Sequence, residues 1–166
     1  VEMVAARKDT RKGRPKGGII LATRKGIYEE DTNAKSWKGK EFIGKEVRRK
    51  GKRLYVGVAY MRECRKENRE MMEEMTDLAR SEMVLFGGDY NARTGEKMGC
   101  ELYKEKRRRS KDKVINEEGE ELLEWLDNKG LNIVNRRMEG NEEGSFTYIS
   151  SRGCSVIDYV ITNEEG

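Results

Sequence analysis

Residues 84–95 read Val-Leu-Phe-Gly-Gly-Asp-Tyr-Asn-Ala-Arg-Thr-Gly. The apolar start of this stretch, with Met83 before it, predicts a buried strand, and the paired glycines predict its end. Asp89 and Asn91 follow two residues apart, so their side chains share one face of an extended segment. A carboxylate there can bind a hard cation or orient a water, and an amide can donate to a phosphate oxygen. Gly-Gly-Asp after a strand is also ordinary turn chemistry, and that alternative stays open.

The segments before this stretch predict alternating strands and helices. Apolar, β-branched runs at 18–23 and 54–60 predict two strands, and the basic run 48–53 predicts a hairpin turn. Residues 62–80 predict an amphipathic helix whose buried stripe consists of Cys64, Met71, Met75 and Leu78. The basic residues of 1–16 predict a flexible arm in front of a domain over 17–166.

The segments after it continue the same order. Asn116 predicts the cap of a helix with an acidic first turn and an end at Gly130. The buried side of this helix is predicted to consist of Leu122, Leu123, Trp125 and Leu126. Residues 131–134 predict a strand, and 145–150 with 155–161 predict a hairpin around 151–153. The order of the elements indicates a mixed α/β or α+β fold.

Asp158 and Tyr60 are further candidates for a site. Asp158 lies inside an apolar strand pattern, where a buried carboxylate is costly unless it is paired or bound. Alternation could equally turn Asp158 toward water, and both interpretations stay open. Tyr60 ends a predicted strand, where it could contact a phosphate or form an amphipathic edge.

Composition excludes several classes of function. The chain has 166 residues, no histidine and a net charge of +4, so mechanisms that need an imidazole from this chain alone are excluded. No apolar run reaches the ~18 residues of a membrane span. The three cysteines (Cys64, Cys100, Cys154) form no CxxC pair, which argues against a disulfide framework and a structural zinc site and favours an intracellular, reducing compartment. Because the first residue is not Met, we expect a fragment.

The densest positive stretch runs from Lys104 to Lys113 and predicts an exposed loop. It could contact the phosphates of a nucleic acid without reading sequence, or it could be an ordinary solvated loop. The candidate nucleic-acid-binding residues are Arg107, Arg108, Arg109 and Lys111. A second glycine-rich stretch, 39–45, imitates a phosphate-binding loop, but Glu46 replaces the hydroxyl residue that would hold magnesium, so we reject that interpretation.

In their order, these landmarks resemble the endonuclease/exonuclease/phosphatase superfamily in the form that non-LTR retrotransposons carry. The most specific match is 84–95, which resembles the central GDxN motif of that family. The remaining matches, in chain order, are Arg14-x-x-Gly17-Gly18-Ile19, Val56–Tyr60, Asn116-x-x-Gly119-x-x-Leu122-Leu123, Ile133–Asn135, Phe146–Tyr148 and Ser155–Val160.

The resemblance implies an α+β fold, an incomplete four-layer sandwich of two β-sheets flanked by helices, and Mg²⁺-dependent phosphodiester hydrolysis, with Mn²⁺ as a possible substitute. It implies that Asp89 positions or deprotonates the attacking water and contributes weakly to metal binding, and that Asn91 contacts the phosphate. Tyr60 would approach the scissile phosphate. Asp158 would orient a catalytic histidine. The implied partner is a nucleic acid, DNA first, bound through backbone phosphates, with no membrane and no small-molecule cofactor.

The sequence departs from that family because two of the family's motifs are missing. The family's metal-binding Glu and its Ser-Asp-His motif have no match here, so we expect a domain truncated at both ends. Losing members of a catalytic unit lowers the rate by orders of magnitude, so we expect weak or no hydrolysis by this chain alone. Two hypotheses follow: a fragment of a DNA-nicking retrotransposon endonuclease, or a non-enzymatic basic remnant that binds nucleic acid.

Overall fold

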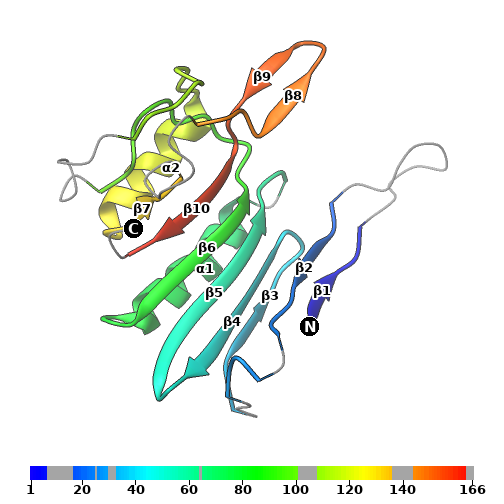
Figure 1. Ribbon diagram of the computed structural model, residues 1–166, viewed down its shortest axis with the longest axis vertical. Coiled ribbons are helices and arrows are strands. Elements are labelled where there is room, and N and C mark those ends of the chain that lie inside the picture. Colours follow the sequence, from blue (N-terminus) through cyan, green and yellow to red (C-terminus); the bar gives the residue numbers. More distant parts are fainter. Residues whose placement is uncertain are drawn as a thin grey trace. The chain divides into compact units, whose positions relative to one another are not determined.

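The computed structural model describes residues 1–6, 17–24, 26–29, 33–63, 65–100, 108–135 and 144–163. The fold is α+β, with strands in more than one sheet and two helices in the described part of the chain (Figure 1). The chain divides into two compact units, Val1–Phe86 and Gly87–Gly166. Strand β6 (Met83–Asp89) contains the boundary, so its first residues belong to unit 1 and its last to unit 2.

Unit 1 is built on an antiparallel hairpin. Strand β4 (Phe42–Arg49) pairs with β5 (Lys52–Tyr60) over the full length of β4, and β3 (Ser36–Lys38) pairs with the other edge of β4. The strand order in this unit is β3-β4-β5-β6. The sequence predicted β5 and the turn before it, but it did not predict β3 or β4. The stretch that imitates a phosphate-binding loop forms the β3–β4 turn and the start of β4.

Helix α1 (Arg65–Ala79) covers one face of β4 and β5, and lies behind them in Figure 1. Its buried residues are Asn68, Met72, Met75 and Ala79. The predicted stripe was right for Met75 and wrong for Leu78, which is 37% exposed, and Cys64 lies outside the described residues. The buried face of the helix is therefore turned relative to the predicted one. The sheet accounts for the position of Met75, because Gly44 has no side chain and leaves room for the Met75 sulfur.

The opposite face of β4 and β5 is covered by a two-stranded sheet of β1 (Glu2–Val4) and β2 (Ile19–Leu21). Its core consists of Ile19, Leu21 and Ile43, with Val4, Val56, Val58 and Tyr60 packed against them. The chain therefore differs from the expected flexible arm at Glu2–Val4, which form a strand. Residues 7–16 of that arm lie outside the described part.

Unit 2 contains α2 (Glu117–Asn128), β7 (Asn132–Ile133), β8 (Tyr148–Ser150), β9 (Gly153–Ser155) and β10 (Asp158–Thr162). Strand β10 lies between β6 and β7 in the strand order. The predicted helix is confirmed: Asn116 caps α2, and Leu122, Leu123, Trp125 and Leu126 are buried.

The hairpin predicted from 145 to 161 is only partly correct. Strands β8 and β9 pair around a turn, as predicted, but the second predicted strand is divided between β9 and β10. Between them, the backbone N–H groups of Ile157 and Asp158 donate to the hydroxyl of Thr147, at 3.1 and 3.2 Å, instead of to a neighbouring strand. This side-chain acceptor ends one strand and begins the next.

Among the residues that the structure describes, no helix is long and apolar enough to cross a bilayer.

The close packing at Gly57 gives a test of the sheet. A Cβ there would lie 2.7 Å from the ring of Phe42 and 2.8 Å from that of Phe86. We expect Gly57→Ala to lower the free energy of unfolding by about 1–3 kcal/mol, as overpacking of a core does. Gly87→Ala is the control, because nothing lies within 4 Å of its added methyl group. Urea denaturation of both variants measures the two free energies of unfolding. Equal values would contradict the close packing at Gly57.

Candidate active site

The end of β6 carries the first two candidate residues into unit 2. Asp89 is the last residue of β6, and the backbone N–H of Tyr90 donates to the carbonyl of Ile157 at 2.8 Å. Asp158, the next residue, begins β10. The structure thus brings the backbone of Asp89–Asn91 beside that of Asp158, as a shared site requires.

Asn91 sits in a tight turn that its own neighbours stabilise. Its φ is +45°, in the left-handed region that Asn tolerates better than most residues. Its backbone N–H donates to Oδ1 of Asp89 at 2.8 Å. This contact holds the Asp89 carboxylate and the Asn91 backbone in one arrangement, and both residues remain partly exposed. Turn chemistry and a possible site therefore coexist here, rather than excluding each other.

Arg93 anchors the same segment to a buried carboxylate. Its Nε and Nη2 donate to Asp112 at 2.8 and 2.6 Å, in a two-pronged ion pair. The side chain of Asp112 is only 2% exposed. Two backbone N–H groups, those of Val114 and Val156, also donate to it, at 3.1 and 3.0 Å. Each oxygen of Asp112 therefore accepts two hydrogen bonds.

These contacts determine the charge of Asp112. Burial, the largest single influence, raises its pKa, but the hydrogen bonds from Arg93, Val156 and Val114 together outweigh it, and the pKa lies below its usual 3.8. The hydrogen bond to Asp112 in turn raises the pKa of Arg93. Both groups therefore stay charged at neutral pH.

The phenol of Tyr159 joins the segment 92–94 to the start of its own segment at Val156. Its oxygen lies 2.7 Å from the carbonyl of Val156 and 2.9 Å from that of Ala92, and its proton can serve either. The same oxygen accepts hydrogen bonds from the N–H and hydroxyl of Thr94, at 3.3 and 3.2 Å. Tyr159 is 1% exposed, so these bonds are made away from water.

Asn116 ties the start of α2 to the segment after β6. Its Oδ1 accepts from the backbone N–H of Gly119, as a helix cap, and from that of Arg93 at 2.8 Å. Gly119 is required here, because a side chain would collide with the carbonyl of Arg93. A single side chain therefore caps the helix and holds the loop.

The burial of Arg108 contradicts the prediction that the basic loop is exposed. Arg108 is 1% exposed, its Nη2 donates to the carbonyl of Gly95 at 2.7 Å, and its guanidinium lies 5.3 Å from the centre of the Tyr159 ring. Burial lowers its pKa. The prediction that Arg108 contacts a nucleic acid is wrong for this arrangement, because its packing against Tyr159 removes it from the surface.

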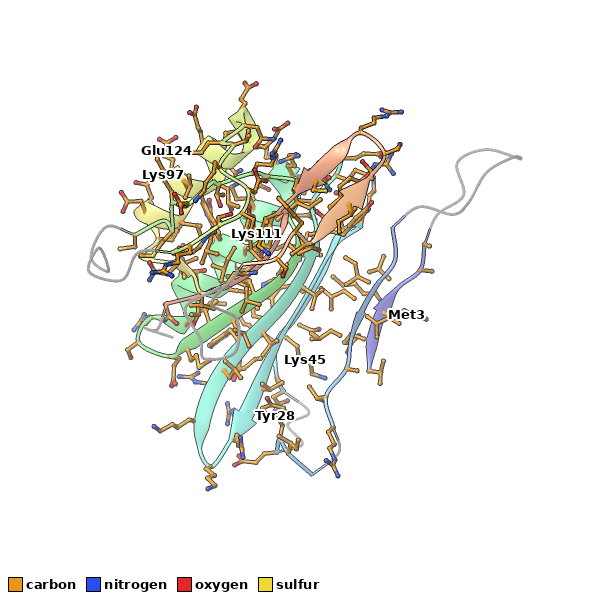
Figure 2. All side chains as sticks on the ribbon, turned by 45° about the horizontal axis from the view of Figure 1, so that its top comes forward. Met3, Tyr28, Lys45, Lys97, Lys111 and Glu124 are labelled. Atoms are coloured by element: carbon orange, nitrogen blue, oxygen red, sulfur yellow. The ribbon has the colours of Figure 1, made fainter. Side chains whose placement is uncertain are left out.

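The other predicted nucleic-acid contacts have different outcomes. Arg109 and Lys111 are exposed, and Lys111 is labelled in Figure 2. Ser110 and Asp112, which alternate with them, are buried. Arg107 lies outside the described residues. The segment is therefore half surface and half core, which its charge alone did not indicate.

The side chains of Asn135 and Thr147 hold the backbone of Asp158 in place. The amide of Asn135 donates to the carbonyl of Asp158 at 3.1 Å, and Oδ1 of Asn135 accepts from the N–H of Val160 at 2.6 Å. The hydroxyl of Thr147 accepts from the N–H of Asp158. Two polar side chains thus fix where β10 begins, and the side chain of Asp158 is partly exposed.

Tyr60 belongs to unit 1. Its backbone N–H donates to the carbonyl of Glu41 at 2.9 Å, and its ring packs on the cluster of Ile19, Leu21 and Ile43. The carboxylate of Glu41 accepts from the N–H groups of Arg62 and Glu63, at 3.1 and 2.9 Å. Glu41 therefore orders Tyr60 and the chain that follows it.

The described residues do not by themselves complete a metal site. No three His, Cys, Asp or Glu side chains among them are grouped so that they could hold an ion. Asp89 can supply one carboxylate oxygen, whereas a hard divalent cation takes about six oxygen ligands, some of them from water.

The sequence did not predict two sets of buried contacts around the site. These are the ion pair of Arg93 with Asp112 and the hydrogen bonds of the Tyr159 hydroxyl. One clue was present, because Asp112 is the single carboxylate between Arg107 and Lys113. A lone acid among cations is a good candidate for an ion pair.

The Arg93–Asp112 pair can be tested by its effect on stability. We expect Asp112→Asn to lower the free energy of unfolding by about 3–5 kcal/mol, because it leaves the Arg93 charge without its partner. Glu96→Gln is the control: it breaks the exposed pair between Glu96 and Lys113, 2.6 Å apart, and should change stability little.

The same variant has a defined pH dependence. Because the folded-state pKa of Asp112 is lowered, its contribution is complete above its usual value of 3.8 and is lost as the pH falls through the folded pKa. The difference between the wild type and Asp112→Asn, measured by urea denaturation, should therefore be constant above about pH 4 and shrink below it. A destabilisation no larger than that of Glu96→Gln would contradict the account.

Comparison with known proteins places the chain in a family. The family model described as endonuclease-reverse transcriptase matches residues 54–166, more than half of the sequence. No curated protein matches the chain.

Two solved structures are similar at low identity. The endonuclease domain of TRAS1, a telomere-specific non-LTR retrotransposon, is 19% identical, with a TM-score of 0.47, over 81% of this chain and 57% of that domain. An endonuclease/exonuclease/phosphatase family protein from Leptotrichia buccalis C-1013-b is 14% identical, with a TM-score of 0.47, over 75% of this chain and 41% of that protein. The chain thus spans 57% and 41% of the lengths of these two proteins.

The match of the family model covers β5 from Leu54 on, the GDxN stretch, α2 and the closing strands. The chain belongs to the endonuclease-reverse transcriptase family, within the endonuclease/exonuclease/phosphatase superfamily.

Proposed function

We propose that this chain carries part of the phosphodiester-cleaving site of a DNA-nicking endonuclease of retrotransposon origin. The observation that carries the proposal is the turn in which the N–H of Asn91 binds the carboxylate of Asp89, beside the start of β10 at Asp158. Membership of the family supports a nuclease or phosphodiesterase.

In this proposal, each residue has a stated task. Asp89 orients the attacking water and accepts its proton, which a carboxylate in a fixed position can do. Asn91 donates its side-chain amide to a non-bridging phosphate oxygen and stabilises the charge that develops there. For Tyr60, at the end of β5, the family resemblance suggests an approach to the scissile phosphate. Mg²⁺ is the proposed cofactor, and it would stabilise the charge of the phosphate and the leaving oxygen.

Asp158 has a different proposed task. By resemblance it orients a histidine, and this sequence contains none. An orienting carboxylate without its imidazole cannot complete proton transfer to or from the substrate. We therefore propose that the chain by itself hydrolyses DNA slowly.

A second candidate function is nucleic-acid binding without cleavage. Two observations favour it: the sequence has no histidine, and the described residues include no cluster of three metal-binding side chains. The two candidate functions differ in whether the protein cleaves DNA and whether that cleavage needs Asp89.

A plasmid-nicking assay with Mg²⁺ separates them. We expect slow conversion of supercoiled to nicked plasmid, stopped by a chelator, and lowered by Asp89→Ala by about 100-fold or to background. The control is Glu124→Ala, which removes an exposed carboxylate of α2, labelled in Figure 2, and should leave the rate unchanged.

Equal nicking by the wild type and Asp89→Ala would refute the catalytic role of Asp89. Salt-sensitive DNA binding with no nicking by either protein would favour the second candidate.

A further inference from the structure

The tip of the β4–β5 hairpin brings like charges together. The hairpin tip is residues 48–53, Arg-Arg-Lys-Gly-Lys-Arg, at the lower end of the long cyan hairpin in Figure 1. In the register of the two strands, Arg48 is opposite Arg53 and Arg49 is opposite Lys52. Like charges directly opposite each other destabilise an antiparallel pair. The tip therefore has two successive unfavourable cross-strand pairs.

The turn itself is also unfavourable for its residues. Lys50 has a φ of +52° and Gly51 a φ of +74°, so both central residues are in the left-handed region. Hairpin turns of this kind favour Asn-Gly or Asp-Gly, because Asn and Asp tolerate a positive φ. Lys gives no such advantage, and it adds a fifth positive charge to the tip.

Among the described residues, two arginines of the tip have carboxylates beside them. On the α1 face, Arg48 lies 3.4 Å from Glu46, and Arg53 lies 3.6 Å from Glu82. The third carboxylate at the tip, that of Glu29, accepts the backbone N–H of Gly51 at 3.1 Å.

On the other face, the part of the chain that the structure describes places no carboxylate against the cations. Arg49, Lys50 and Lys52 are exposed, and the structure records no ion pair for them within the residues it describes. Further along this face, Lys45, which is labelled in Figure 2, lies 3.8 Å from Glu2, so its charge is balanced by β1. The uncompensated charge is therefore confined to the end of the hairpin.

A sequence that breaks several local rules at one exposed place often does so for a partner. Here the common property is unbalanced positive charge, which a polyanion relieves. The hairpin tip contains no apolar side chain. Protein interfaces have an apolar core, whereas phosphate backbones are bound by Arg and Lys without one. The composition of the tip thus favours a nucleic acid over an acidic protein.

We propose that Arg49, Lys50 and Lys52 form a contact for the phosphate backbone of a nucleic acid, separate from the catalytic residues. Lys52 begins β5 and Tyr60 ends it. Tyr60 is eight residue steps along the strand from Lys52, about 26 Å at ~3.3 Å per step. A single duplex touching both would be held at two points. The proposal rests on the proposed function only in its choice of nucleic acid as the partner, and binding can be measured without cleavage.

Binding of a fluorescent 20-base-pair DNA duplex of mixed sequence, in a chelator to prevent cleavage, tests this surface. We expect Arg49→Gln/Lys52→Gln to weaken binding about tenfold at 0.1 M salt, and to lower the slope of log K against log salt by about 2, one for each lost phosphate contact. The melting temperature of this variant should rise, because a repulsive cross-strand pair is removed.

The matched control is Lys66→Gln/Lys97→Gln. It removes two exposed charges that have no ion pair within the described residues, one in each unit, and Lys97 is labelled in Figure 2. We expect less than a twofold change in affinity for it.

Several results would overturn the proposal. One is an unchanged affinity of Arg49→Gln/Lys52→Gln. Another is an equal loss in both double variants, which would indicate nonspecific attraction by net charge. A lower melting temperature would show that the tip stabilises the fold. If polyglutamate binds the wild type as tightly as DNA, the partner is an acidic polypeptide. Equal nicking by the wild type and Asp89→Ala would refute the proposed function. It would not contradict the proposed nucleic-acid contact at the hairpin tip.

Discussion

The carboxylate of Asp112 is the contact on which the candidate site depends. Its oxygens accept hydrogen bonds from Arg93, Val114 and Val156, and together these contacts replace the water that the carboxylate loses on burial. A buried charge is tolerated only when it is paired and hydrogen-bonded in this way. Because the donors come from three separate segments, the pair also fixes where these segments meet.

A fixed segment is what a phosphodiester-cleaving site needs. Asn91 adopts a positive φ, and the chain after it is held by Asn116, Asp112 and Tyr159. Such contacts hold catalytic groups in position before the substrate arrives, and misplacing them by about 1 Å can lower a rate 100-fold. The surface features are different in kind. The hairpin tip in unit 1 is rich in charge, because five of its six residues are Arg or Lys.

The sequence predicted the parts of the fold that local chemistry determines. The cap at Asn116 and the turn before β5 depend on neighbouring residues alone, and both are confirmed. The predicted end of β6 at the glycines is wrong, because the strand continues through them to Asp89. It did not predict β4, because the charges and glycine of 42–49 interrupt the alternation that indicates a strand.

Tertiary contacts determine the parts that the sequence did not predict. The buried face of α1 depends on the room above Gly44, in a strand the sequence did not reveal. Arg108 is a cation in a basic run, and only the ring of Tyr159, fifty-one positions later, explains its burial. For the candidate site, the motif identified Asp89 and Asn91, but the contacts that hold them come from distant residues. Their roles in catalysis stay predictions.

Hydrogen exchange of backbone amides tests the central claim, that the segment after β6 is held rigid, most directly. Four amides in it are hydrogen-bonded: Tyr90 to Ile157, Asn91 to Asp89, Arg93 to Asn116 and Thr94 to Tyr159. The account predicts that these amides exchange as slowly as those of the neighbouring strands β6 and β10. Exchange at the rate of an unprotected loop would contradict it.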